Sequence, residues 1–121
     1  MSVNLHGSSA TYAPECLTLD FSPWLANQKL NYSNVVEMLD SDDFYEFERK
    51  VQGGTSVDEL TYHGGGHLGV GDDLGIMGNV YSSAGDPSFY LHHANLDRLW
   101  NKWQQRGNSF LFPWYFFRLD C

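Results

Sequence analysis

The clearest pattern of apolar and polar positions lies near the end of the chain, over residues 86–106. Residues there recur at alternating spacings of four and three, as on one face of an α-helix: Phe89, His93, Leu96, Trp100 and Trp103. Asp86 suits the helix N-cap, Pro87 suits the first turn, and Gly107 suits the end. We therefore expect a helix over residues 86–106 whose apolar stripe faces the interior and carries His93 inward.

Two shorter stretches predict helices in the first half of the chain. Asn34 followed by Glu37 resembles a capping box, and the apolar residues after it predict a helix through residue 39. Ser41 is expected to cap the next helix, with apolar positions at 44, 47 and 51. Gly53 and its neighbour glycine are expected to end this second helix.

Other stretches predict no helix. Leu17, Leu19 and Phe21 alternate with polar residues, which indicates a short strand. Residues 64–85 contain eight glycines, which is typical of a loop. The expected fold class is therefore mainly α with long irregular connections.

Length and composition restrict the class of protein. A chain of 121 residues with 42% hydrophobic residues is enough for one domain with a modest core. The net charge of −8 argues against a nucleic-acid partner, because such partners are bound chiefly through Lys and Arg. The longest apolar run, FLFPWYFF, is far shorter than the roughly 20 residues that cross a bilayer, so no membrane span is expected.

The histidines are grouped in a way that indicates a metal site. A single histidine such as His93 on an apolar helix face is more often a hydrogen-bonded core residue than a ligand. However, His63 and His67 stand four apart, which places two imidazoles on one side of a helix. With His92 and His93, four of the five histidines in the chain fall into two groups. This grouping favours a metal site over an isolated core histidine.

The donor types narrow the choice of metal to copper or zinc. The chain has two cysteines, too few for a thiolate site, and no carboxylate at a matching spacing. Three imidazoles would leave one coordination position open for reactivity. Three consecutive glycines between His63 and His67 each cost a helix roughly 0.8–1 kcal/mol relative to alanine. Metal binding or tertiary packing is therefore expected to hold this turn.

Residues 86–104, DPSFYLHHANLDRLWNKWQ, carry the pattern D-P-x-F-x-x-H-H-x-x-x-D-R. This pattern resembles the second copper-binding signature of the family of tyrosinases, catechol oxidases and molluscan haemocyanins. The upstream histidine pair also fits that half of the family, and the segment PECLTLDFSP resembles the sequence preceding it in short fungal members. The resemblance covers roughly residues 11–105.

The resemblance implies a fold, a ligand set and a chemistry. The expected fold is part of the family's four-helix bundle, and the expected ligands of one copper are His63, His67 and His93. His92 matches a neighbour of the ligands, with a place in the surrounding shell. The family oxidises phenols or catechols to quinones with O₂ at a pair of coppers, each held by three histidines. We expect this chain to supply one copper ion of the two.

The same resemblance divides the chain into two segments. Residues 1–106 are expected to form the C-terminal half of a tyrosinase copper-binding domain. Residues 107–121 form an atypical aromatic tail, which we interpret as the product of a misread exon boundary or a frameshift. Genomic sequence with an uninterrupted frame would refute this interpretation. The alternative is an ordinary apolar segment that packs on the core.

Two residues near the histidines have roles to be tested. Asp97 lies four residues after His93, so it can reach the same side of the helix and orient a ligand imidazole. Its alternative role is an ion pair on the helix surface. Gly64 occupies the position where efficient monophenol hydroxylases of the family often carry Asn. The resemblance thus implies a preference for diphenol oxidation.

Three functions remain open at this stage. The first is a phenol or catechol oxidase, which the chain alone is not expected to complete. The second is an oxygen carrier of the haemocyanin type. The third is a non-catalytic protein that binds one copper or zinc ion. Because two helices of a bundle leave an apolar face uncovered, self-association is also expected.

Overall fold

The computed structural model describes residues 2–6, 9–54 and 59–106, and the fold is mainly α, as expected. The predicted aromatic tail, residues 107–121, lies outside the described residues. The elements follow in the order β1 (Ser2–His6), β2 (Ser9–Glu15), α1 (Pro23–Lys29), α2 (Tyr32–Leu39), α3 (Phe44–Gln52), α4 (Tyr62–Gly71), the 3₁₀ turns η2 (Ile76–Gly78) and η3 (Ser83–Gly85), and α5 (Pro87–Gln105).

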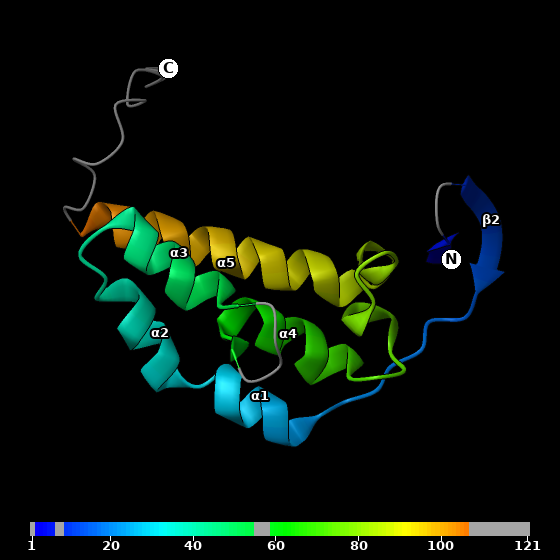
Figure 1. Cartoon of the computed structure of the whole chain (residues 1–121), viewed down its shortest axis with the longest axis horizontal. Coiled ribbons are helices and arrows are strands. Elements are labelled where there is room, and N and C mark those ends of the chain that lie inside the picture. Colours follow the sequence, from blue (N-terminus) through cyan, green and yellow to red (C-terminus); the bar gives the residue numbers. More distant parts are fainter. Residues whose placement is uncertain (1, 7–8, 55–58, 107–121) are drawn as a thin grey trace, which may run out of the picture.

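The helices form one body, and the two strands form a hairpin at one end of it (Figure 1). Helix α5 runs along one side next to α3, α4 lies in the middle, and α1 and α2 lie on the opposite side (Figure 1). Strands β1 and β2 pair antiparallel, with Ser2 opposite Glu15 and His6 opposite Ser9. The fold thus places α4 between α1 and α5.

The strand predicted at residues 17–21 is wrong. This segment is extended but pairs with no strand, because its backbone hydrogen bonds go to the end of α4 and to η2. The N–H of Asp20 donates to the carbonyl of Val70 at 3.3 Å, and the carbonyl of Thr18 accepts from Ile76 at 3.0 Å. The predicted apolar residues are 47–62% exposed, so their alternation does not separate an inner from an outer face.

The predicted helix caps lie two or three residues from the observed ones. Asn31 caps α2 by accepting from the N–H of Asn34 at 3.0 Å, whereas the Asn34 side chain donates to carbonyls at the end of α1. Asp43 caps α3 by accepting from the N–H of Glu46 at 2.8 Å. Ser41 is instead buried before the helix. The end of α3 at Gly53, which has φ +68°, is confirmed.

The loop prediction fails over residues 64–71, which belong to α4. Helix α4 contains five glycines, and close packing explains why its sequence tolerates them. A Cβ on Gly65 would overlap the Lys29 side chain of α1, and a Cβ on Gly71 would overlap the backbone of Gly78. The missing side chains let α1 and η2 approach the α4 backbone, so tertiary contacts offset the low helix propensity.

Helix α5 begins as predicted. The Asp86 side chain accepts from the N–H of Ser88 at 2.8 Å, and Pro87 occupies the first turn. Its end is also close to the prediction, since Gln105 is the last helical residue. Neither α5 nor any other described helix is long and apolar enough to span a membrane.

The expectation that the whole apolar stripe of α5 faces the interior is wrong in part. Leu99 and Trp103 are buried, whereas Trp100 is 40% exposed. Trp103 anchors the core: its indole N–H donates to the Ser41 carbonyl at 2.8 Å, and its ring stacks on Phe47 at 4.9 Å. The helix is thus rotated so that Trp100 lies at the surface beside the histidines.

Alanine substitutions along α4 should separate packing from helix propensity. Gly71→Ala is expected to lower the free energy of unfolding by about 1–3 kcal/mol, because its Cβ would overlap backbone atoms. In Gly64→Ala the Cβ meets only the flexible end of Leu60, so the gain in helix propensity keeps stability within about 1 kcal/mol of the parent. Urea denaturation measures both. Equal stability of the two variants would contradict the packing explanation.

Candidate metal site

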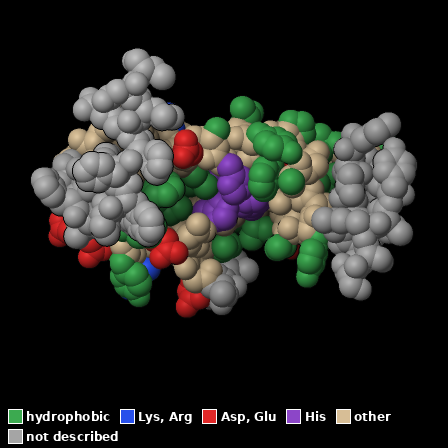
Figure 2. Space-filling view, turned by 90° about the horizontal axis from the view of Figure 1, so that it is seen from above, with side chains coloured by type: hydrophobic (Ala, Val, Ile, Leu, Met, Phe, Trp, Pro, Cys, Tyr) green, Lys and Arg blue, Asp and Glu red, His purple; other side chains and the backbone are tan. Residues whose placement is uncertain are grey.

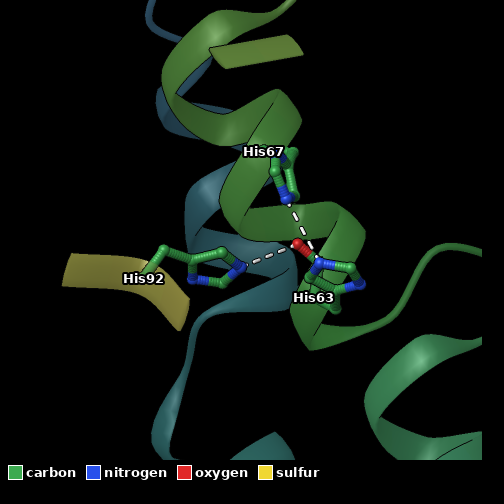
Figure 3. A group of neighbouring side chains, drawn as sticks. All are labelled: His63, His67 and His92. Carbon is green, nitrogen blue, oxygen red and sulfur yellow. Dashed lines mark hydrogen bonds between the residues drawn. The ribbon is translucent and has the colours of Figure 1, made fainter. Parts of the chain in front are cut away.

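Three imidazole rings meet between α4 and α5. Nε2 of His67 lies 3.2 Å from Nε2 of His63 and 3.2 Å from Nε2 of His93. His63 and His67 stand one turn apart on α4, and the 3.2 Å contact between their Nε2 atoms is drawn as a dashed line in Figure 3. All three rings are partly buried. The structure therefore brings together the three histidines that the sequence predicted as ligands.

The protein fixes which nitrogen of two rings carries the proton. Nδ1 of His67 donates to the carbonyl of Met77 at 2.9 Å, and Nδ1 of His63 donates to Oε1 of Gln52 at 2.6 Å. When these imidazoles are neutral, each Nε2 must then carry a lone pair. Both lone pairs lie on the side where the rings converge, which is the arrangement that a cation requires.

Two of the three spacings between the nitrogens match those expected around a single ion. Three nitrogens bound to one ion at 2.0–2.1 Å with near-tetrahedral angles lie roughly 3.3 Å from one another. Nε2 of His67 lies 3.2 Å from the corresponding atoms of His63 and His93. Imidazole nitrogens suit copper or zinc better than magnesium or calcium. The residues present therefore fit the type of metal expected from the sequence.

His92 also lies close to the site but is differently engaged. Nε2 of His92 donates to the backbone carbonyl of His63 at 2.9 Å (Figure 3). Its ring packs against Gly66, where a Cβ would overlap it. His63, His67 and His92 each offer a nitrogen within 4.8 Å of the others, which makes them an alternative ligand group. Ligation by Nε2 of His92 would break its hydrogen bond to the backbone.

Phe89 contacts the imidazole rings, whereas Asp97 is exposed to solvent. Asp97 is exposed, and within the described part of the chain no hydrogen bond joins it to an imidazole. The Phe89 ring lies 4.1 Å from that of His93, between centroids, and 5.8 Å from that of His67. Phe89 therefore packs directly on the rings, whereas Asp97 lies at the rim of the cavity beside α3.

Sequence reasoning missed the groups that orient two of the rings. Gln52 lies eleven residues before His63, and Met77 acts through its backbone carbonyl, ten residues after His67. No helical spacing relates either residue to the histidine it contacts. The only available signal was the general need of ligating histidines for a partner on the second nitrogen, which does not identify the partner.

Burial favours the neutral form of His63, His92 and His93. Desolvation lowers the pKa of His63 from its ordinary value of 6.5 to about 4, and the neighbouring histidines add to this shift. Desolvation also lowers the pKa of His92 and His93. Because a metal binds the neutral imidazole, these lowered pKa values favour the ligating form of His63 and His93 at neutral pH.

The histidines lie at the surface, with hydrophobic side chains around them (Figure 2). A mainly apolar cavity of about 410 Å³ borders the three rings and is lined further by Leu60, Leu68, Val80 and Phe89. A cavity of about 250 Å³ borders His63 and His93 on the side of α3. A larger hollow of about 490 Å³ at α2 and α3 contains none of the histidines. One cavity therefore reaches all three rings, and the other reaches His63 and His93.

Comparison with known proteins agrees with this geometry. Residues 1–106 match the tyrosinase family, described as the common central domain of tyrosinase. Tyrosinase P of Aspergillus terreus is 33% identical over 111 residues, which are 90% of this chain and 29% of that protein. The (+)-larreatricin hydroxylase of Larrea tridentata is 38% identical over 89 residues, or 64% of this chain and 15% of that protein.

A solved structure shows the same fold. A variant of polyphenol oxidase from Thermothelomyces thermophila superimposes with a TM-score of 0.75 at 30% identity, over 88% of this chain and 31% of that one. The chain thus spans less than a third of the length of each of these relatives. The mainly helical fold deduced from the sequence is the fold of this neighbour.

The lowered pKa of His63 predicts a pH-dependent stability in the metal-free protein. Above pH 6.5 the imidazole is neutral in both states, so this contribution to stability is fully present. As the pH falls from 6.5 to about 4, the unfolded chain binds a proton that the folded chain does not, so the free energy of unfolding decreases. Urea denaturation at several pH values measures the slope.

A His63→Gln variant provides the comparison for this pH dependence. It keeps every carboxylate, so its slope between pH 6.5 and about 4 should be shallower than that of the parent. The lowered pKa values of His92 and His93 leave part of the slope in place. Identical slopes in parent and variant would show that His63 does not titrate as described.

Proposed function

Because the chain belongs to the tyrosinase family, we propose that His63, His67 and His93 hold one copper ion through their Nε2 atoms. The observation that carries this proposal is the pair of 3.2 Å distances from Nε2 of His67 to Nε2 of the other two. The membership itself implies copper, and the three nitrogens supply the donors that copper prefers. The fourth coordination position is left for O₂ or substrate.

The alternative ligand group with His92 is less favourable. Its Nε2 already donates to the carbonyl of His63, so binding a metal through that nitrogen would give up this hydrogen bond between α5 and α4. Nε2 of His93 faces Nε2 of His67, and among the described residues it makes no hydrogen bond to a main-chain group. We therefore assign His92 to holding the backbone of α4 against α5.

The proposed reaction is oxidation of phenols or catechols to quinones with O₂. Each catechol loses two electrons and two protons, so two catechols reduce one O₂ to two waters. Each phenol gains one oxygen atom from O₂, and the other oxygen atom leaves as water. Bound copper would supply the electron transfer. The apolar side chains of Leu60, Leu68 and Phe89 line a cavity against the rings that suits a planar aromatic molecule. The proposed substrate class is therefore a small phenol.

The complete reaction requires a second copper with three further histidines. The sequence has five histidines, of which one, His6, lies outside the two groups. We propose that this chain contributes one copper site of a pair. The same count favours, as a second candidate function, a protein that binds one copper or zinc ion without catalysis. The relatives named above are oxidases and a hydroxylase, which gives no support to an oxygen carrier.

Metal analysis of single-histidine variants should test the ligand set. The parent is expected to bind one copper per chain, and His93→Ala should weaken copper binding by at least about 100-fold through loss of a ligand. His92→Ala should lower stability but still bind one copper. Elemental analysis and competition with a chelator measure both. Loss of copper in His92→Ala with retention in His93→Ala would favour the alternative group.

Catechol oxidation should test whether one copper site alone supports turnover. Because the sequence has only five histidines, the copper-loaded chain by itself is expected to form no quinone from catechol and O₂. Quinone absorbance measures turnover, and a complete polyphenol oxidase serves as the positive control. Turnover by the purified chain at one copper per chain would contradict the need for a second three-histidine group.

Self-association is proposed through the apolar surface beside the histidines. Trp100 is 40% exposed there, and it lines the smaller cavity together with Phe44 and Leu96. Sedimentation equilibrium should show a concentration-dependent increase in mass, which Trp100→Gln should reduce. Tyr45→Gln, which removes an aromatic ring that is 69% exposed on α3, is the control. A mass that does not change with concentration would exclude the proposal.

A further inference from the structure

We propose that Gln52 is a positioning residue of the metal site, acting through the tautomer and orientation of His63. The proposal rests on the assignment of His63 as a ligand. Oε1 of Gln52 accepts the Nδ1 proton of His63 at 2.6 Å, the shortest hydrogen bond to any of the imidazoles. An imidazole that donates from Nδ1 must present its lone pair at Nε2.

The three rings differ in what holds the nitrogen remote from the site. His67 donates to a main-chain carbonyl, that of Met77, which no side-chain substitution removes. For His93, the described part of the chain shows no partner at Nδ1. His63 depends on a side chain, and that side chain comes from another helix. Gln52 is therefore the point at which α3 influences the ligand geometry.

The backbone around Gln52 is fixed relative to the start of α4. The hydroxyl of Thr61 donates to the carbonyl of Val51 at 2.6 Å, and the N–H of Gly54 donates to the carbonyl of Glu59 at 3.1 Å. Gly53 pairs with Leu60 in an antiparallel bridge. These contacts lie on both sides of the glutamine in sequence. They set its Cα beside His63, so the amide needs only its own side-chain torsions to reach Nδ1.

Gly53 is what permits this arrangement. Its φ of +68° is a conformation that side chains with a Cβ rarely adopt, and a Cβ there would overlap the carbonyl of Glu59. The chain can therefore turn directly after Gln52, and Gly53 pairs with Leu60 just before α4. The glutamine stands at the last helical position of α3 because the helix ends at this glycine.

Without this amide, the ring of His63 gains a competing state. It can carry its proton on Nε2 and donate that proton to the lone pair of Nε2 of His67, 3.2 Å away. In that state the nitrogen aimed at the metal is blocked. Gln52 disfavours it by accepting at Nδ1, so its removal should weaken metal binding while leaving all three ligands in place.

The first test needs no metal. Two-bond ¹H–¹⁵N correlation NMR of the metal-free protein at about pH 8, above the ordinary histidine pKa, reports the tautomer of each ring. The parent should show His63 protonated at Nδ1. Gln52→Met, similar in size but without an acceptor oxygen, should shift the population towards protonation at Nε2. Gln52→Glu retains an acceptor and should keep the proton at Nδ1.

A glutamine far from the site provides the matched control. Gln105 lies in α5, twelve residues after His93 and so roughly 18 Å along the helix axis, and it contacts Asn101. Gln105→Met should leave the His63 tautomer unchanged. An unchanged tautomer in Gln52→Met would overturn the proposal, and so would a shift of equal size in Gln105→Met.

The second test measures copper affinity by competition with a chelator. Gln52→Met should bind copper about tenfold more weakly, at the low end of the range for orienting residues because Gln52 is exposed. Gln52→Glu should bind at least as tightly as the parent, and Gln105→Met should match it. Parental affinity in Gln52→Met would overturn the proposal.

The two tests separate this proposal from the ligand assignment. If the parent itself binds no copper, the proposed function fails, whereas the NMR spectra still decide whether Gln52 sets the tautomer. If copper binds and the tautomer does not depend on Gln52, the ligand assignment stands and the positioning role falls. Far-UV circular dichroism of each variant confirms that the helices are retained in both tests.

Discussion

Imidazole lone pairs that point at one another repel unless a cation lies between them, and the structure around this site is what holds them in that arrangement. Nε2 of His67 faces two other Nε2 atoms, each 3.2 Å away. The carbonyl of Met77 and the amide of Gln52 keep the protons of His67 and His63 on Nδ1 and away from Nε2. The three rings and the two groups that orient them come from α3, α4, η2 and α5, so the packing of these elements determines the arrangement.

The helices meet at the site because their contacts elsewhere are well packed. Trp103 is fully buried and joins α5 to α3 by stacking on Phe47, and its hydrogen bond to Ser41 joins α5 to the connection before α3. Near the histidines, the side chains are less buried, and the three rings border a cavity lined mainly by apolar side chains. Stability therefore comes mainly from one end of α5, whereas the other end supplies His93 and remains open to a ligand. In α5, the residues that stabilise the fold and the residue that contributes to the site therefore lie in different parts of the helix.

The sequence predicted the parts of the structure that local spacing determines. Asp86 and Pro87 mark the start of α5 because capping depends on neighbouring residues, and His63 and His67 converge because they stand one turn apart. Beyond the turn from His63 to His67, the sequence did not predict that the glycine-rich stretch is helical, since that depends on contacts with α1 and η2. Gln52 was missed for the same reason: its contact with His63 is set by the packing of α3 on α4.

The five glycines of α4 have a consequence for the order of assembly. Relative to alanine they disfavour the helix by about 4–5 kcal/mol, so an isolated segment would sample mostly coil, with its two imidazoles far from alignment. Docking of α1 and η2 must come before the histidine pair exists as a chelate. A metal ion that needs both imidazoles at once would therefore bind after these parts of the fold have come together.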